Sequence, residues 1–506
     1  MSVTSAGSEA DRRSSDAVLS ATGIQVVFSS QARNLVDGDL NHLVDGPGVV
    51  FYGTDIFVRD LVRGTTERIS TTSAGTEIEG DSQAPAISTD ARLIAFESSG
   101  LNLSPGLGLR QVYLKHRDDE TLTLVSRNPG GDPGNGQSSR PSMSGDGGIL
   151  AFDSEATNLV DPPSSEVQSV FAYDVARATL NRLSVGIGGV DPDGPSFGAS
   201  VSTDGSMVAF VSGASNLVLG DDGEGRPDVF LAAVPSGTLS RIPAGSLGGS
   251  ASTVAVSDNG CVVAFSIIAD AGGGSTVAVR DCTEVVPHVV AEGTLTTDRA
   301  LSGDGRLLMI DRGDDVFLLD RSSMTETLVS RRSDGAPGRG YSYQGAISKN
   351  GRVLALSSSA PDLIEDDTNG DVDVFSSSLD QLCDDGDACT SNRYEGGSCL
   401  ASDLAGTEKI ECELAEPWPP PSCAGDPIPH GVSRVLGRVR RLFQRFADDL
   451  GPRRRARVAR RTLARIKRAE KAMENAAGWN ASICRDDVQT RIDELRSGIR
   501  SARPPQ

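Results

Sequence analysis

The sequence has 506 residues, of which 38% are hydrophobic and only 4% aromatic, with 57 glycines and 25 prolines. This composition is typical of a globular protein with many turns and short strands, and it is too apolar for a disordered chain. No run approaches 18 consecutive apolar residues, which excludes a membrane-spanning helix.

Charge is distributed unevenly along the chain. The 48 Lys and Arg residues against 69 Asp and Glu give a net charge of −21. Residues 431–506 carry a net charge of +12, so the first 430 residues carry −33. This asymmetry predicts at least two structural units.

A repeated phrase organises the first 380 residues: a short apolar strand, a turn of the type Ser-x-Asp-Gly, and a second apolar strand. The clearest copy is 86–96, and the others run over 19–28, 142–152, 201–210, 256–265, 301–310 and 347–356. The last residues of successive copies are 45 to 68 residues apart. Seven copies at such a period predict a repeat architecture.

Each copy continues into further strands. A third strand follows in all seven copies, at 55–58, 111–114, 169–171, 228–231, 276–279, 315–318 and 373–375. A fourth strand follows in six copies, for example at 66–70 and 327–330. The second strands are apolar on both faces, whereas the fourth strands alternate as an outer edge does. We therefore predict a mainly β fold, a seven-bladed β-propeller of four-stranded blades over residues 1–380, with a solenoid as the alternative.

The N-terminus matches the end of a blade. Residues 1–9 align with residues 69–77, at the tail of a fourth strand. The seventh copy has no fourth strand after Phe375, so we expect the N-terminal residues to supply it and close the ring. Residues 1–20 contain no signal peptide. We expect Met1 to be internal to a longer product with a signal peptide upstream.

The blades resemble the TolB-like family of WD-repeat-like propellers. The turn Ser302-Gly303-Asp304-Gly305-Arg306 and the strand Asp315-Val316-Phe317-Leu318-Leu319-Asp320 carry the resemblance. It implies a bacterial envelope or secreted propeller, since the best-known member is a periplasmic protein that binds envelope partners. Related propellers occur fused to peptidases and in pectate-degrading lyases, so the resemblance is specific for fold and not for function.

One acidic loop is a candidate metal site. The phrase Asn-Leu-Val recurs after the second strands, and in the seventh copy oxygen-bearing side chains alternate around Gly370. These are Asp367, Asn369, Asp371 and Asp373. Such spacing suits calcium, although the bidentate Glu at the twelfth place is missing. The alternative is a turn, which Asn, Asp and Gly also form without a metal.

Catalytic motifs are missing from the sequence. The four histidines, His42, His116, His288 and His430, fall in different copies or linkers. There is no His-Glu-x-x-His, no Gly-x-Ser-x-Gly and no phosphate-binding loop. We therefore assign no catalytic and no cofactor-binding residue.

The cysteines predict an oxidising compartment. Cys261 and Cys282 stand at neighbouring strand ends, where they form either a disulfide or two buried thiols. A Cys-rich, Pro- and Gly-rich linker over 381–430 is predicted from Cys383, Cys389, Cys399, Cys412 and Cys423, and Cys484 makes six, which allow 15 pairings. The run 383–390 looks like modules of secreted bacterial surface proteins, and such cysteine usage is typical of a periplasmic, cell-surface or secreted protein.

The C-terminal region is helical by its periodicity. Apolar stripes over 432–446, 459–473 and 488–499 predict a basic helical hairpin or three-helix unit within 431–506. Cys484 is expected to tie this unit to Cys412 or Cys423. The basic helices could dock on the acidic propeller or on an anionic surface such as lipid. Nucleic acid is the least favoured partner, because no aromatic residues interleave with the basic ones.

These observations favour a non-catalytic propeller of the envelope or secreted space that binds a protein or a glycan. The alternative is an enzyme of the polysaccharide lyase or glycosidase type with its site in the central funnel. Carboxylates and histidines clustered around one channel mouth would favour that alternative.

Overall fold

The computed structural model describes residues 2–403 apart from 40–41, 45–49, 104–107, 221–225, 245–246, 271–272, 365–366, 382–389 and 396–397. The chain divides into two compact units, Met1–Leu382 and Cys383–Gln506. The described part of the second unit is a hairpin of β30 (Thr390–Glu395) and β31 (Ser398–Asp403). The predicted helical tail and Cys383, Cys389, Cys412, Cys423 and Cys484 lie outside the described residues.

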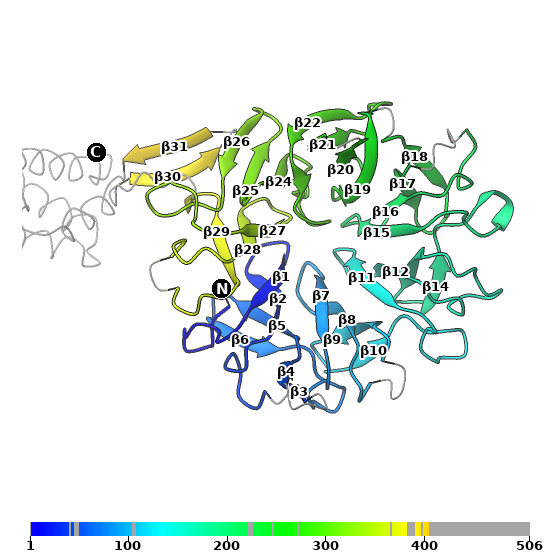
Figure 1. The fold of residues 1–506 in the computed structure, drawn as a ribbon, viewed down its shortest axis with the longest axis horizontal. Coiled ribbons are helices and arrows are strands. Elements are labelled where there is room, and N and C mark those ends of the chain that lie inside the picture. Colours follow the sequence, from blue (N-terminus) through cyan, green and yellow to red (C-terminus); the bar gives the residue numbers. More distant parts are fainter. Residues whose placement is uncertain are drawn as a thin grey trace, which may run out of the picture. The chain divides into compact units, whose positions relative to one another are not determined.

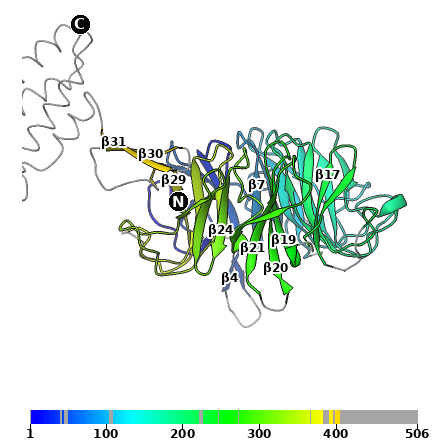
Figure 2. The same cartoon turned by 90° about the horizontal axis from the view of Figure 1, so that it is seen from above.

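The first unit is a seven-bladed β-propeller, as predicted, with its antiparallel sheets arranged around a central axis (Figure 1). Seen edge-on, the strands of the blades run between the two faces of the ring (Figure 2). None of the described helices is long and apolar enough to span a membrane. The fold prediction is therefore confirmed.

Six blades have four strands each and the seventh has three. The bounds are β1 (Ser14–Leu19), β2 (Gln25–Ser30), β5 (Asp55–Asp60) and β6 (Thr65–Arg68) in blade 1; β7 (Ser82–Ile87), β8 (Leu93–Ser98), β9 (Gln111–His116) and β10 (Leu122–Leu124) in blade 2; β11 (Ser138–Met143), β12 (Ile149–Ser154), β13 (Ser169–Asp174) and β14 (Thr179–Arg182) in blade 3; β15 (Ser196–Val201), β16 (Met207–Ser212), β17 (Asp228–Ala233) and β18 (Leu239–Ile242) in blade 4; β19 (Gly249–Val256), β20 (Val263–Ala269), β21 (Ser275–Arg280) and β22 (His288–Glu292) in blade 5; β23 (Thr294–Leu295), β24 (Leu307–Arg312), β25 (Asp315–Asp320) and β26 (Thr325–Leu328) in blade 6; and β27 (Ser342–Ile347), β28 (Val353–Ser358) and β29 (Asp373–Ser378) in blade 7.

Two further elements lie outside the blades. A hairpin of β3 (His42–Val44) and β4 (Val50–Tyr52) extends from the connection between β2 and β5. A short 3-10 turn, η1 (Ile187–Gly189), follows β14. Neither element was predicted from the repeat.

The core lies between neighbouring blades and is built from the second and third strands. In four blades a ring of the second strand stacks on a ring of the third, as in Phe28–Phe57 and Phe152–Phe171, both 5.9 Å apart. These side chains are fully buried, and Phe28 packs with Ala355 and Val374 of blade 7. The scarcity of aromatic residues is thus compensated by placing them at equivalent core positions of the repeat.

The Ser-x-Asp-Gly turn joins the first and second strands through a fixed set of hydrogen bonds. In blade 6 the Oγ of Ser302 donates to Asp304 (2.6 Å) and accepts the N–H of Leu307 (2.9 Å). The Oδ1 of Asp304 accepts the N–H of Arg306 (3.0 Å), and Gly305 has a φ of +74°. Glycine suits this left-handed position, which explains the last residue of the motif.

The seven turns meet at the axis and are joined in a closed circle of backbone hydrogen bonds. Each turn donates an N–H to a carbonyl of the next turn, at 2.7 to 3.4 Å. The donor and acceptor pairs are Ala21–Thr89, Thr89–Gly145, Gly145–Thr203, Asp204–Asp258, Asp258–Gly303, Gly303–Lys349 and Asn350–Ala21. This circle, which we call the turn ring, surrounds the axis at the turn face.

Blade 6 departs from the repeat in its innermost strand. From Ser15 to Leu19 the chain of blade 1 takes four steps, whereas the equivalent path from Thr294 to Leu301 takes seven. The three extra residues lead the segment 296–299 into the channel. There Arg299 donates to the carbonyl of Pro141 in blade 3 (3.1 Å), and the carbonyl of Asp298 accepts from Ser200 in blade 4 (3.3 Å).

The N-terminal residues close the ring at blade 7, as predicted. The N–H of Ser2 donates to the carbonyl of Val374 (3.4 Å), and its Oγ accepts the N–H of Val374 (3.1 Å) and donates to Asp373. Ser70 makes the same contacts with Ile56 and Asp55 in blade 1. Ser2 therefore occupies the place at which a fourth strand ends in the other blades.

We predict that Ser2→Ala lowers the free energy of unfolding of the propeller by about 1–3 kcal/mol, because the substitution leaves a buried carboxyl and a backbone N–H without their shared partner. Ser70→Ala is the matched control within a covalently continuous blade, and we expect a loss of similar size. Urea titrations at equal pH measure both. A destabilised Ser70→Ala beside an unchanged Ser2→Ala would contradict closure by the N-terminus.

Candidate functional sites

The predicted calcium residues are only partly brought together. The carboxyl groups of Asp367 and Asp373 lie within 4.8 Å of each other and of Glu9, which comes from the N-terminal segment. Asn369 donates its Nδ2 to Asp373 (2.7 Å), and its Oδ1 accepts the N–H of Asp371 (2.6 Å). The side chain of Asp371 is exposed and lies outside the cluster.

Blade 1 contains an equivalent carboxylate cluster, formed by Asp39, Asp55 and Glu77. Asp39 lies like Asp367 in the loop between the second and third strands, and Asp55 begins its third strand as Asp373 does. Glu77 is the residue that aligns with Glu9. The buried guanidinium of Arg68 pairs with Glu77 (2.7 Å) and Asp39 (3.4 Å), so this cluster contains its own cation.

Burial and mutual repulsion act on both clusters. Burial raises the pKa of Asp55 to about 7, although Arg68 opposes the shift. Burial and the charge of Asp373 raise the pKa of Asp367 to about 6. Within the described residues no basic side chain forms a salt bridge with the blade-7 cluster, whereas Arg68 does so in blade 1. A bound cation such as calcium would take the place of that guanidinium, and calcium binding at blade 7 stays a prediction.

We predict that calcium binds the full chain and raises its melting temperature, and that Asp367→Asn removes both effects. Three carboxylates can share a hard cation with oxygen ligands at about 2.3–2.6 Å. The exposed Asp371 provides the matched control, because Asp371→Asn removes the same charge outside the cluster. Calorimetry with calcium measures the binding. Equal losses in the two variants would indicate the linear motif rather than the carboxylate cluster, and no heat with the wild type would refute the site.

Carboxylates of the second strands face the next blade inside the ring. Glu97 accepts the N–H of Arg140 (2.9 Å), and Asp153 accepts the N–H of Gly198 (3.0 Å). Asp311 accepts the N–H of Gln344 in the same way. The three donors sit at bulges of the first strands with φ between +52° and +67°. The acids thus hold the bulges from one blade to the next, and at Arg140 and Gln344 the bulge requires a positive φ of a residue other than glycine.

Asp153 is the most buried of these acids. Its side chain is fully enclosed, its Oδ2 lies 3.3 Å from the Nε of Arg140, and no hydrogen bond reaches its Oδ1 in the described structure. Burial raises the pKa of Asp153 to about 7, against the opposing effect of Arg140. The carboxyl group is therefore largely protonated below neutral pH.

This pKa predicts a specific pH dependence of stability. Unfolded Asp153 ionises near pH 4, whereas the folded residue stays protonated up to about pH 7, so its contribution to stability is complete below pH 4 and is lost as pH rises through 7. Between about pH 4 and 7 the free energy of unfolding should fall less steeply with pH in Asp153→Asn than in the wild type. The difference between the two slopes should correspond to the uptake of up to one proton. Asp314→Asn, at an exposed turn, should leave the slope unchanged. Parallel slopes for wild type and Asp153→Asn would contradict the assignment.

A small axial cavity lies behind the turn ring. It has a volume of about 60 Å³ and is lined by inner-strand and turn residues that include Asp298, Arg299 and Lys349. The Nζ of Lys349 lies 4.0 Å from Asp258. Of the two histidines with described side chains, His116 lies on β9 and His288 on the outer strand β22, and neither lines this cavity.

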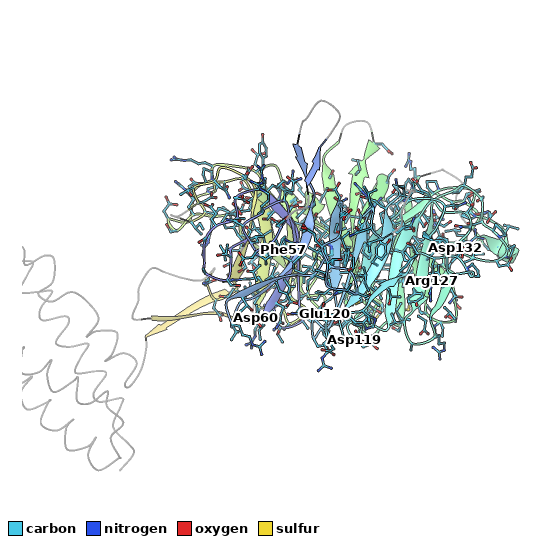
Figure 3. All side chains as sticks on the ribbon, turned by 90° about the horizontal axis from the view of Figure 1, so that it is seen from below. Phe57, Asp60, Asp119, Glu120, Arg127 and Asp132 are labelled. Carbon is cyan, nitrogen blue, oxygen red and sulfur yellow. A yellow bond between two sulfur atoms is a disulfide. The ribbon has the colours of Figure 1, made fainter. Side chains whose placement is uncertain are left out.

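A broad concavity lies at the rim between blades 2 and 3. This cavity of about 1050 Å³, which we call the rim groove, is bounded by the loop 127–131 after blade 2, by the loop 159–163 and by the outer strand β14. Tyr173 and Leu180 form part of its wall. Arg127, labelled in Figure 3, also lines the groove, and its guanidinium has no ion pair among the described side chains.

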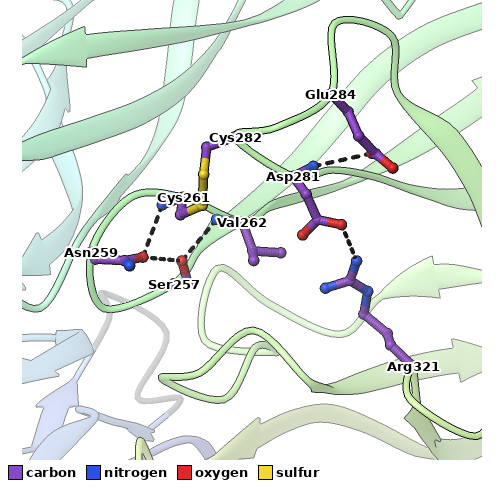
Figure 4. The surroundings of a disulfide bond; sticks show 8 residues. All are labelled: Ser257, Asn259, Cys261, Val262, Asp281, Cys282, Glu284 and Arg321. Carbon is purple, nitrogen blue, oxygen red and sulfur yellow. Dashed lines mark hydrogen bonds and ion pairs between the residues drawn. A yellow bond between two sulfur atoms is a disulfide. The ribbon is translucent and has the colours of Figure 1, made fainter.

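A disulfide joins Cys261 and Cys282 in blade 5, with their Cα atoms 4.7 Å apart (Figure 4). Cys261 precedes β20 and donates its N–H to Asn259 (3.0 Å), which replaces the Asp of the repeated turn. Next to Cys282, Asp281 pairs with Arg321 of blade 6 (2.7 Å). The bond thus links the ends of two strands at the boundary with the next blade.

The sequence did not reveal several of these groups. Glu9 was missed because the cluster combines the two ends of the propeller. Arg68 and Tyr173 look like ordinary strand residues until the strands of all blades are aligned. The three extra residues before Leu301 could have been found from the sequence. The fifth and sixth copies of the repeat are closer together than the earlier copies, yet the first strand of the sixth blade takes more residues.

Together, the blades, the turn ring and the rim groove define a seven-bladed β-propeller. No family model matches the sequence, and no curated protein matches it.

Solved structures similar to this chain include several propellers. TolB from Acinetobacter baumannii is 16% identical with a TM-score of 0.36, over 54% of this chain and 58% of that protein. An oligogalacturonate lyase from Vibrio parahaemolyticus is 12% identical with a TM-score of 0.45, over 73% and 90%. The β-propeller domain of the Trilobed protease from Pyrococcus furiosus is 10% identical with a TM-score of 0.43, over 72% and 95%. The chain thus spans less than two thirds of the TolB that it resembles.

Proposed function

We propose that this chain is a non-catalytic binding propeller of the cell envelope or the secreted space, which recognises a protein partner. The observation that carries the proposal is the occupation of the central channel by the chain itself. The turn ring surrounds the axis at one end, and the segment 296–299 crosses the interior from blade 6 to blades 3 and 4. A substrate bound along the axis would have to displace this segment.

The carboxylates of the channel support the same proposal. Glu97, Asp153 and Asp311 each accept a backbone N–H of the neighbouring blade, so their oxygens serve the assembly of the ring. The described histidines lie on β9 and β22, away from the axial cavity. A lyase or glycosidase site would need acids and bases that can reach a substrate.

The disulfide of blade 5 and the cysteines after residue 382 support an oxidising compartment. In such a compartment a disulfide persists, whereas cytoplasmic thiols are kept reduced. A periplasmic, surface or secreted location follows as part of the proposal. The acidic balance of the first 430 residues favours partners other than nucleic acid.

We predict that the purified full chain releases no product from polygalacturonate, from neutral polysaccharides or from peptide substrates, because the channel is filled by its own residues. Product formation is followed by ultraviolet absorbance of unsaturated sugars, by reducing ends and by released amines. The control is the Asp153→Asn variant, which must show the same background. Turnover by the wild type that Asp153→Asn reduces would refute the proposal and favour the enzyme.

A further inference from the structure

At the rim groove blade 3 lacks two contacts that blades 1 and 2 make at the equivalent place. The first contact uses the fifth residue of the third strand. In blade 1 this residue is Arg59, which donates to the carbonyls of Thr4 in the preceding segment (2.9 Å) and of Gly64 (2.8 Å). In blade 2 it is Lys115, which donates to the hydroxyl of Thr71 in blade 1 (2.9 Å).

The equivalent residue of blade 3 is Tyr173. It pairs with Leu180 in the sheet, as Arg59 pairs with Thr66 and Lys115 with Leu122. No hydrogen bond joins its hydroxyl to the preceding loop within the described structure, and its ring forms a wall of the rim groove. A cation that bridges two blades has thus been replaced by an apolar wall.

The second contact concerns the free edge of the outer strand. In blade 1 the N–H of Thr66 donates to the Oγ of Ser5 (2.9 Å), and in blade 2 the N–H of Leu122 donates to the Oγ of Ser73 (2.9 Å). These hydroxyls satisfy the one edge N–H that points toward the preceding loop.

In blade 3 the residue equivalent to Ser5 and Ser73 is Pro129, which has no hydroxyl to offer. The N–H of Leu180 at the edge of β14 therefore faces the rim groove without the acceptor that blades 1 and 2 provide. An unpaired strand edge beside a cavity is suited to a further strand.

Arg127 supplies the charge of the groove. The neighbouring Arg182 is paired with Asp191, whereas the guanidinium of Arg127 has no carboxylate partner among the described residues. It lies on the loop that faces β14. A ligand that covers Leu180 and Tyr173 therefore also meets an unneutralised cation, which favours a carboxylate at that point.

From these features we infer that the rim groove binds an extended peptide segment of a partner protein, which adds to the edge of β14 and places an acidic side chain on Arg127. The inference rests on the proposed binding function and specifies its site and partner. Apolar residues of the peptide would pack against Tyr173, Leu159 and Leu180. One carbonyl of the peptide would accept the N–H of Leu180.

The test is a selection of random peptides displayed on phage, against the full chain. We expect enriched peptides to alternate apolar residues with at least one acidic residue. The synthetic form of an enriched peptide should lose about tenfold or more in affinity for Arg127→Glu, since a charge-assisted hydrogen bond is replaced by repulsion. A second selection against Arg127→Glu should enrich basic residues instead.

The variant Pro129→Ser tests the groove without relying on a destabilised protein. It introduces the serine whose hydroxyl accepts the equivalent edge N–H in blade 2, so we expect it to keep the melting temperature and to lose the peptide. Arg92→Glu, an exposed charge at the turn face, should bind as the wild type does. Enrichment of basic or purely apolar peptides, no enrichment at all, or unchanged binding by Pro129→Ser would overturn the inference. Such a result would leave the absence of turnover, and thus the proposed function, untouched.

Discussion

The circle of backbone hydrogen bonds at the axis is the constraint on which the propeller depends. Because each turn donates to the next, a turn can shift only if its two neighbours follow. Side chains at the seven positions point into a limited space. Three of the positions are therefore Ala21, Gly145 and Gly303, and a Cβ at Gly303 would approach Asp258 to 2.1 Å. The described cavity at the axis is accordingly small, about 60 Å³.

The same circle explains why the useful surface lies elsewhere. The interior of the channel is crossed by Arg299, whose guanidinium donates to the carbonyl of Pro141 in blade 3. The acids that would suggest chemistry hold the bulges of adjacent blades. Residues can therefore vary without disrupting the ring mainly at the rim, where each blade packs against the loop that follows the preceding blade.

The repeat made the fold predictable, because the same turn and the same strand pattern recur seven times. It also predicted the closure, since residues 1–9 align with residues 69–77. The sites were not predictable in this way, because they arise where one copy departs from the others. Pro129 and Tyr173 are unremarkable residues in a loop and a strand. Only the contacts of Ser73 and Lys115 at the equivalent place in blade 2 reveal what the two substitutions remove.

The contact of Ser2 with Asp373 spans 371 residues of the chain. During synthesis at about 5–20 residues per second, the N-terminal segment waits roughly 20–70 seconds for its partner strand to be made. In that interval the edge of the first strand of blade 1 is exposed. Because the ring is still open, the propeller does not yet fold and unfold as one cooperative unit. The ring can therefore close only after the strand Asp373–Ser378 has been synthesised, more than a hundred residues before the end of the 506-residue sequence.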